Sequence, residues 1–213
     1  MDTEFSKYLG KRLPFSSDPK YQGFKKYVLQ SVERGEKIMD SIVPHLSLEN
    51  KKILDIGCAD GGVAVAFAKA GCQVTALDLN PDNIAMAKLR AQEENVSLNF
   101  LEQKAEEIDF PLHSFDGVIM NDFLEYTLDA RLILKKLGSI IKPGGFCYIA
   151  VLNRLYWFNK KIRGVDHQRF YFYWELCRLL KKNGFSPIFM DSKPWRRPFR
   201  SYWKILAIKN RLV

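Results

Sequence analysis

Residues 52–62 read KILDIGCADGG, so a lysine and a short apolar run lead into an acid and then a glycine-rich turn. Small residues follow from Val63 to Ala70, and this order predicts a buried strand, a tight loop and a helix. Glycine allows positive φ and lets a ligand touch bare backbone. A helix start presents free N–H groups and a positive dipole end. The segment therefore predicts a nucleotide-type site at the carboxyl end of a strand.

Two details indicate which kind of nucleotide this site would take. Ala59 stands where a G-x-G-x-x-G fingerprint needs its second glycine, and no Lys-Ser/Thr pair of a P-loop is present, so a pyrophosphate cradle is disfavoured. Asp78 ends the next predicted strand, where a carboxylate can accept hydrogen bonds from both hydroxyls of an adenosine ribose. Asn80 and Pro81 then supply a helix cap and a first helical residue.

Further segments follow in a fixed order. After LDIGCADGG (54–62) they are LDLNP (77–81), AEE (105–107), SFDGVIMND (114–122), Leu137 to Ile141 and KPGGF (142–146). Over residues 52–151 the chain thus resembles the class I S-adenosylmethionine-dependent methyltransferases. The resemblance implies an α/β fold: a single Rossmann-like methyltransferase domain with a mostly parallel seven-stranded sheet, an antiparallel last strand and helices on both faces. An unrelated doubly wound α/β domain with glycine loops is the alternative.

Apolar runs and helical spacings alternate along the chain, which predicts a parallel sheet with right-handed crossovers. Strands are expected near 52–57, 73–78, 97–101, 116–121, 146–151, 185–190 and 203–208. Helices are expected near 61–70, 81–94, 129–141 and 170–183, after a helical spacing from Lys20 to Val43 that Gly35 weakens. Residues 1–45 are predicted to form an N-terminal cap or lid with a helix, and residues 46–213 the cofactor-binding domain. A frayed chain end is the alternative to a lid.

The resemblance also implies which residues would hold S-adenosyl-L-methionine. The glycine loop would line its methionine and ribose parts through Gly57, Cys58, Ala59 and Gly61. Asp55 would order this loop, Asp78 would bind the ribose hydroxyls and Leu79 would pack on the adenine ring. Ala105 and Glu106 would meet the adenine edge. A strand-end cap for Asp55 and a solvent-exposed acid for Glu106 are the alternatives.

The segment from Asn121 to Tyr126 carries candidates for chemistry. By resemblance, Asn121 would approach the methionine end of the cofactor. The segment is also similar to the E-x-L-E-H segment of quinone-biosynthesis O-methyltransferases, where two acids and a histidine can hold a divalent ion. Asp122 and Glu125 match the acids and are catalytic candidates. Tyr126 replaces the histidine, and because a neutral phenol is a poor ligand for a hard cation, we expect no metal. Acids that cap or pair at a helix start are the alternative.

A histidine is the third catalytic candidate. The stretch GVDHQRF over residues 164–170 precedes an E-L-x-x-L-L helix pattern, which is similar to a segment of methyltransferases acting on quinones, lipids and surface sugars. In that family segment the histidine lies on a loop over the acceptor pocket. Because an imidazole titrates near neutral pH, His167 is the predicted general base. A hydrogen-bonded structural histidine is the alternative.

Charge is distributed unevenly along the chain. Residues 151–213 hold 15 Lys and Arg against 3 Asp and Glu, and 14 of the 28 aromatic residues. We expect a small-molecule or lipid-linked acceptor with negative charge and an apolar part, methylated on oxygen, and a peripheral contact with an anionic membrane. The residues expected at the acceptor entrance are Trp195, Arg196, Arg197, Phe199 and Arg200. The alternative is a solvated basic face over an aromatic core.

Two other functions use the same features. An RNA methyltransferase would grip phosphates and stack bases with the basic segment, although no Asn-Pro-Pro-Tyr-like segment follows the fourth strand. A non-catalytic cofactor-binding subunit that activates a partner enzyme would keep the glycine loop. The four scattered cysteines form no C-x-x-C pair, and no apolar run approaches the ~20 residues of a membrane span. With no signal-peptide core in residues 1–10, we expect a cytoplasmic protein.

Overall fold

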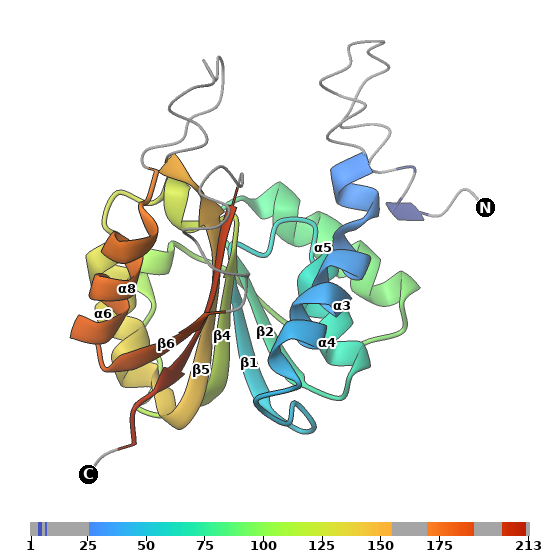
Figure 1. The fold of residues 1–213 in the computed structure, drawn as a ribbon. Coiled ribbons are helices and arrows are strands. Elements are labelled where there is room, and N and C mark those ends of the chain that lie inside the picture. The colour runs from blue at the N-terminus through green and yellow to red at the C-terminus, as the bar shows by residue number, and fades with distance from the viewer. Residues whose placement is uncertain (1–3, 6, 8–25, 155–169, 190–201, 212–213) are drawn as a thin grey trace. The chain divides into compact units, whose positions relative to one another are not determined.

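The computed structural model describes residues 4–5, 7, 26–154, 170–189 and 202–211 (Figure 1). The chain divides into two compact units, residues 1–104 and residues 105–213. Seven strands and their helices occur in the order expected of an α/β fold. Within the described residues no helix combines the length and the hydropathy needed to cross a bilayer.

The first unit is built on three parallel strands. They are β1 (Lys52–Ile56), β2 (Gln73–Asp78) and β3 (Asn99–Glu102), in the order β3-β2-β1. Asp55 pairs in register with Ala76, and Asp78 with Glu102. After its exposed first residue, β1 is buried at every position, which is why this strand is a continuous apolar run closed by an acid.

Three helices pack on this unit (Figure 1). They are α3 (Ser31–Ile42), α4 (Gly62–Lys69) and α5 (Pro81–Glu93). Helix α4 lies against β1 and β2, and α3 lies against α4. The side chain of Asn80 accepts a 2.9 Å hydrogen bond from the N–H of Asp82, and Pro81 is the first helical residue, so the cap predicted from sequence is confirmed.

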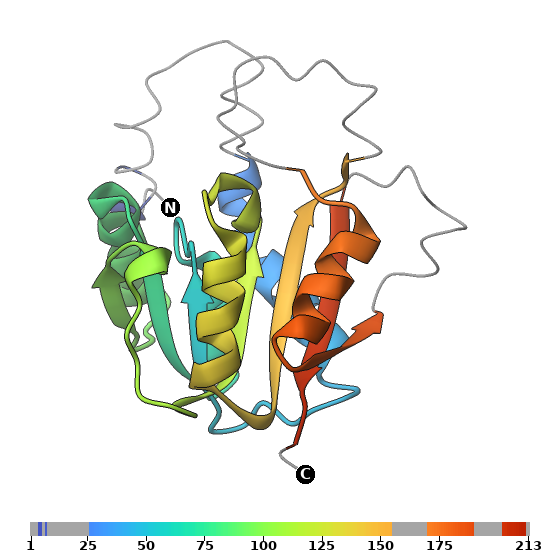
Figure 2. The same ribbon diagram turned by 90° about the vertical axis from the view of Figure 1, so that its left-hand side faces the viewer.

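The second unit holds the other four strands. They are β4 (Phe115–Asn121), β5 (Ile141–Leu152), β6 (Phe185–Phe189) and β7 (Tyr202–Lys209), in the order β4-β5-β7-β6. Strands β4 and β5 are parallel, whereas β7 is antiparallel to both of its neighbours, so the predicted antiparallel last strand is confirmed. Helices α6 (Ala130–Ile140) and α8 (Tyr173–Lys182) lie side by side in Figures 1 and 2.

The largest differences from the expected boundaries are at β5 and at the first helix. Strand β5 begins at Ile141 rather than at residue 146, because Ile141 pairs with Phe115 before the register shifts between Phe115 and Gly117. The expected helix over residues 20–43 is described from residue 26, and a turn at Gln30 separates its first turn from α3. Gly35 does not interrupt α3, in which it is buried. Within the predicted cap, residues 1–45, the residues 1–3, 6 and 8–25 lie outside the described part of the chain, so this division stays a prediction.

Candidate active site

The loop after β1 folds over the end of β2. The backbone N–H groups of Gly57 and Cys58 both donate to the carbonyl of Leu77, at 2.8 and 3.0 Å. Gly57, Ala59 and Gly61 have positive φ, of 74°, 48° and 75°. A Cβ on Gly61 would lie 2.9 Å from the backbone Cα of Ala87 in α5, so only glycine fits there. Gly57 and Gly61 therefore adopt positive φ without steric cost, whereas Ala59, which has a Cβ, is strained at its positive φ.

Asp78 holds this loop in place. Its Oδ2 accepts a 2.9 Å hydrogen bond from the N–H of Ala59, and its Oδ1 accepts from the N–H of Asn80 at 2.9 Å and from Nδ2 of Asn83 at 3.1 Å. One carboxylate thus joins the glycine loop to the β2–α5 turn. A carboxylate offers about four acceptor positions. Three of these positions are occupied by protein donors, so about one is left for the predicted hydrogen bond from a ribose hydroxyl.

A large apolar side chain follows this carboxylate directly. Leu79 is 59% exposed at the start of the turn into α5. An exposed leucine next to an acid offers an apolar surface for a base and a hydrogen-bond acceptor for the sugar linked to it. The predicted contact of Leu79 with adenine is consistent with this placement and stays a prediction.

Asp55 is a buried acid with an unused oxygen. It is 2% exposed at the end of β1, and its Oδ2 accepts no hydrogen bond from the described residues. Burial raises the pKa of Asp55 to about 7, with further upward contributions from the charges of Asp78 and Asp60, while the N–H of Ala64 lowers it. A buried oxygen without a donor is costly. Oδ2 of Asp55 is therefore available to accept a hydrogen bond from a ligand or to pair with a cationic group of a ligand.

The predicted residues of the second unit lie on two short turns. Ala105 is buried and Glu106 half-buried in the 3₁₀ turn η1 (Ala105–Glu107). Asn121 ends β4, and its Nδ2 donates to Oδ2 of Asp122 at 3.1 Å. Asp122 has φ 55°, which aspartate tolerates better than most residues, and its N–H donates to the carbonyl of Ala150 at 2.9 Å.

Glu125 has the most strongly raised pKa among the described carboxyl groups of this unit. It is 1% exposed in the turn η2 (Leu124–Tyr126), and its Oε2 accepts no hydrogen bond from the described residues. Burial raises the pKa of Glu125 to about 8; the charge of Asp122 adds to the rise, and the N–H groups of Glu125 and Leu152 oppose it. Burial likewise raises the pKa of Tyr126 to about 12. Such a carboxyl is protonated at neutral pH and becomes a base just above it.

Some predicted residues are not brought into view. His167 and the five expected entrance residues, Trp195 to Arg197 with Phe199 and Arg200, lie outside the described residues. Among the residues that are described, no group of three or more His, Cys, Asp or Glu side chains is placed to hold a metal ion. The four cysteines remain thiols, and Cys58, Cys72 and Cys147 are buried.

Sequence reasoning missed a buried polar cluster beside the glycine loop. Asp60, inside the loop, forms an ion pair with Arg90 of α5 and accepts a hydrogen bond from Ser31 of α3. All three side chains are almost fully buried. One signal was available: Asp60 puts an acid in a loop of small residues, and a buried acid requires a partner.

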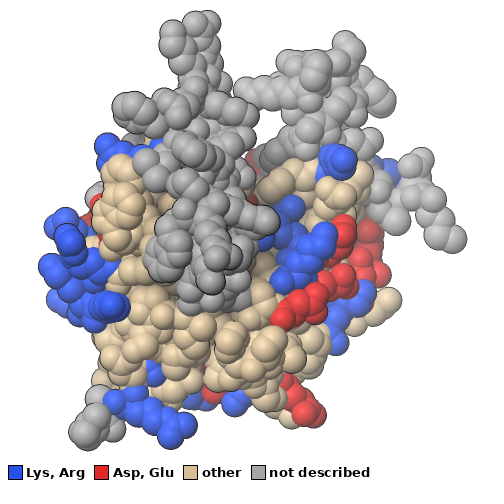
Figure 3. All heavy atoms as spheres, in the orientation of Figure 1, with Lys and Arg blue, Asp and Glu red and all other residues tan. Residues whose placement is uncertain are grey.

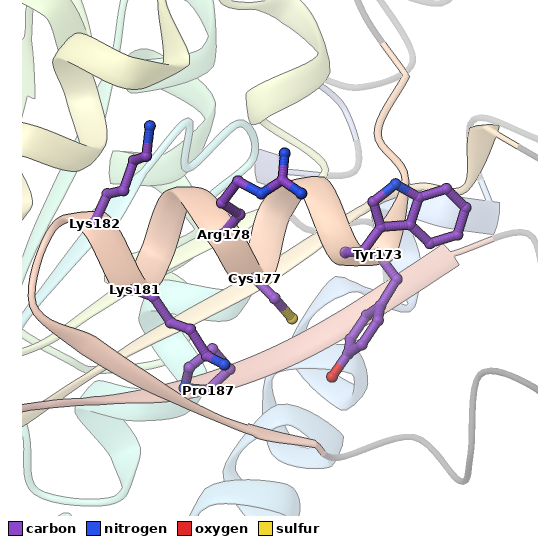
Figure 4. A pocket seen from close by; sticks show the side chains of 7 residues that line it. Tyr173, Cys177, Arg178, Lys181, Lys182 and Pro187 are labelled. Carbon is purple, nitrogen blue, oxygen red and sulfur yellow. The ribbon is translucent and has the colours of Figure 1, made fainter.

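A shallow groove in the second unit runs between α8 and β6, with a volume of about 670 Å³. In Figure 4, Tyr173, Cys177 and Lys181 lie on the side of α8 that faces Pro187 of β6, while Arg178 and Lys182 point to the opposite side. Trp174 also lines the groove; it is 56% exposed and stacks on Phe172 with centroids 4.6 Å apart. Figure 3 shows Lys and Arg gathered where α6 and α8 lie.

Comparisons with known proteins bear on both units. The family described as a methyltransferase domain matches residues 54–149. A ubiquinone biosynthesis O-methyltransferase of Xanthomonas campestris pv. campestris (strain B100) is 33% identical over 117 residues, which are 54% of this chain and 49% of that protein. Residues 54–149 of the chain are therefore similar to a methyltransferase domain. The resemblance seen in the sequence is thereby confirmed.

Solved structures extend the likeness in fold to almost the whole chain. Magnesium protoporphyrin IX methyltransferase from Synechocystis PCC 6803, crystallised with bound SAH, aligns with a TM-score of 0.71 at 16% identity over 98% of this chain and 96% of that one. The [4+2]-cyclase SpnF aligns with a TM-score of 0.66 at 17% identity over 83% and 81%. The predicted Rossmann-like fold is confirmed. Because one of these proteins is a cyclase, the fold alone does not decide the reaction.

The match does not cover the full length of the curated relatives. The chain spans about half the length of the curated relatives it matches. The reaction, the substrate and the partners of this chain therefore have to be argued from its own residues.

Proposed function

We propose that this chain is a cytoplasmic S-adenosyl-L-methionine-dependent methyltransferase that acts on an oxygen of a small-molecule or lipid-linked acceptor. One observation carries the proposal: the carboxylate of Asp78 holds the strained glycine loop next to Asp55, whose buried Oδ2 has no donor among the described residues. The curated relatives named as ubiquinone biosynthesis O-methyltransferases support oxygen as the methylated atom.

The residues of the first unit fit the charge of this cofactor. Asp60 and Asp78 are buried around the glycine loop, and Arg90 is the one buried cation near them among the described residues. Asp55, with a pKa of about 7, adds a third negative charge when a cationic ligand draws its proton away. The loop region therefore carries excess negative charge in a medium of low dielectric, where it favours a cationic ligand. NAD, with its anionic pyrophosphate, lacks this complementarity, and the loop lacks the glycine pattern that cradles one.

When bound, S-adenosyl-L-methionine supplies a methyl group that its positive sulfur already activates. The chain must then hold an acceptor hydroxyl in line with that group and take up the hydroxyl proton as the oxygen–carbon bond forms. Glu125 suits the second task, because its Oε2 has no donor among the described residues and its pKa of about 8 lets it bind a proton near neutral pH. The charge of Asp122 acts on Glu125, and we assign Asp122 the task of orienting the acceptor. His167 is the second candidate base.

The basic C-terminal segment supports a further part of the proposal, peripheral contact with an anionic membrane. Within the described residues, Arg178, Lys181 and Lys182 are exposed on α8, and the exposed indole of Trp174 lies at the start of the same helix. Cations beside an aromatic ring suit a surface of anionic headgroups. An acceptor linked to a lipid would reach the enzyme at such a surface.

Two measurements test the function. Calorimetry should detect binding of S-adenosylmethionine and of its demethylated product, but not of NAD. Incubation with labelled cofactor and a panel of phenolic and lipid-linked hydroxyl acceptors should then transfer label to an acceptor. Cofactor binding without transfer to any acceptor, but with activation of a partner enzyme, would favour the non-catalytic subunit. Transfer to short RNA instead would favour the RNA methyltransferase.

A further inference from the structure

Arg90 connects three segments that are far apart in sequence. Its side chain is buried within α5, at 6% exposed. Its Nε donates to the carbonyl of Asp60 at 3.0 Å, and its Nη2 donates to the carbonyl of Val28 at 3.0 Å and to the carboxylate of Asp60. The ring of Phe5 packs on the guanidinium, 4.0 Å from centroid to Cζ. One side chain thus touches the glycine loop and two parts of the N-terminal segment.

Asp60 is the other half of this arrangement. It lies in the glycine loop between Ala59 and Gly61 and is 4% exposed. Its Oδ2 accepts a 2.5 Å hydrogen bond from the hydroxyl of Ser31 in addition to the bond from Arg90. Burial raises the pKa of Asp60, whereas the charge of Arg90 lowers it. A buried carboxylate of this kind depends on its partner, since removing one member leaves an uncompensated charge.

The start of α3 rests directly on the loop. A Cβ on Gly62 would lie 1.9 Å from Oγ of Ser31 and 2.7 Å from its backbone carbonyl carbon, so the two segments are in close backbone contact. Phe5 is also fixed to α5, because its N–H donates to Oε1 of Glu93 at 2.6 Å, and it packs with Val28 against Met86. The N-terminal segment therefore meets α5 and the glycine loop around one guanidinium.

We propose that Arg90 is a positioning residue that couples the docking of the N-terminal segment, through Phe5 and Val28–Ser31, to the shape of the glycine loop that holds the cofactor. The proposal rests on the proposed function only in naming the ligand. Arg90 fixes Asp60 from both its backbone carbonyl and its carboxylate, and the neighbouring Ala59 and Gly61 need positive φ. If the bonds between Arg90 and Asp60 break, the glycine loop loses the geometry that the cofactor needs. Conversely, a bound cofactor that fixes the loop also stabilises the contacts of Arg90 with Val28 and Phe5.

The test uses Arg90→Lys, which keeps the charge but cannot donate from Nε and Nη2 together. Binding of S-adenosylhomocysteine is measured by calorimetry, and backbone hydrogen exchange is followed with and without it. In the wild type, the ligand should slow exchange of amides in residues 26–31 as well as in residues 57–62. In Arg90→Lys the ligand should bind about tenfold more weakly, within the usual range of coupling between sites, and protection of residues 26–31 should be lost.

A second variant keeps the test independent of ligand binding. Phe5→Ala removes the ring on the guanidinium and should speed exchange of the Ala59 amide in the ligand-free protein. Ile84→Val is the matched control, since it trims a buried side chain of the same helix and should leave the Ala59 amide unchanged. If Phe5→Ala leaves that amide unchanged, or if Arg90→Lys retains the ligand-induced protection of residues 26–31, the coupling is wrong. If the wild type binds no cofactor but Phe5→Ala still speeds exchange of the Ala59 amide, the proposed function is wrong and the coupling stands.

Discussion

The backbone N–H of Ala59 lies 2.9 Å from Oδ2 of Asp78, so a carboxylate at the end of β2 stabilises a strained residue in the loop that follows β1. The two residues come from neighbouring parallel strands whose carboxyl ends meet at one edge. The strain at Ala59, with φ 48°, and the hydrogen bond that offsets it together shape the proposed cofactor site.

The strain at Ala59 predicts unequal effects of substitution. Ala59→Val should lower the free energy of unfolding by about 1–2 kcal/mol, because a β-branched residue is poorly tolerated at positive φ. Ala59→Gly should be close to neutral, since relief of strain offsets the larger entropy of the unfolded chain. Ala70→Gly is the control, at an exposed residue with φ −82°, and should destabilise by about 0.5–1 kcal/mol. Urea titrations at constant pH measure all three. Equal losses for the two glycine variants would contradict strain at Ala59.

Removal of the Asp78 carboxylate should weaken cofactor binding. Asp78→Ala removes the acceptor of three protein hydrogen bonds and the proposed ribose ligand, so we expect a loss of about 1.5–3 kcal/mol in binding free energy. Asp40→Ala, which removes an exposed acid from α3, is the control and should leave binding unchanged. Calorimetry with S-adenosylmethionine decides. Unchanged affinity in Asp78→Ala would show that the carboxylate does not serve the ligand.

The raised pKa of Asp55 predicts how stability varies with pH. Its folded value of about 7 exceeds the ordinary value of 3.8, so the folded state binds more protons between these values. Stability from this group is therefore greatest below pH 4 and is lost as pH rises to about 7, by on the order of 2–4 kcal/mol. Asp55→Asn should make the ligand-free protein more stable at pH 8 and flatten the pH dependence, while weakening cofactor binding. Denaturant titrations at pH 5.5 and 8 measure this; an unchanged slope would contradict the buried, protonated Asp55.

The amino-acid sequence predicts the strands and helices around this site well, but it does not predict which side chains are buried and paired inside it. The bounds of β2 follow from an apolar run between a glutamine and an acid, and the start of α5 follows from Asn80 and Pro81, because both signals are local. The pairing of Arg90 with Asp60 joins positions that are 30 residues apart, and no local period encodes it. Glu125 is a candidate because residues 121–126 are similar to a segment of quinone-biosynthesis O-methyltransferases, but the sequence does not show its burial, which depends on tertiary packing.

The pKa of Glu125 predicts the pH dependence of turnover. If Glu125 accepts the acceptor proton, kcat should rise with pH through about 8, where the carboxyl loses its own proton. Glu125→Gln should lower kcat by roughly 10²–10⁴-fold and abolish that inflection. His167→Gln tests the other candidate base. If the pH profile of kcat shows an inflection at about 6.5 that disappears only in this variant, the base is His167 instead. Cofactor affinity, measured in parallel, should be similar in both variants.

The exposed cations of α8 predict a salt-dependent contact with anionic vesicles. Replacing Arg178, Lys181 and Lys182 by glutamine should lower association by about 1 kcal/mol per charge near the surface, and added salt should act in the same direction because exposed charges are screened over roughly 8–10 Å. Since the groove also presents the exposed ring of Trp174, Trp174→Ala should weaken the association that remains at high salt.

A charge-matched control separates this surface from the net charge of the protein. Lys26, Lys37 and Lys88 are exposed in the first unit, and their replacement by glutamine changes the net charge equally. Co-sedimentation with anionic vesicles at two ionic strengths should respond to the α8 triple variant and not to this control. An equal response of both would mean that binding follows overall charge, because long-range attraction does not distinguish faces. If short RNA responds to the α8 variant and vesicles do not, the basic helix serves nucleic acid, since phosphate contacts carry the same salt dependence without requiring a lipid surface.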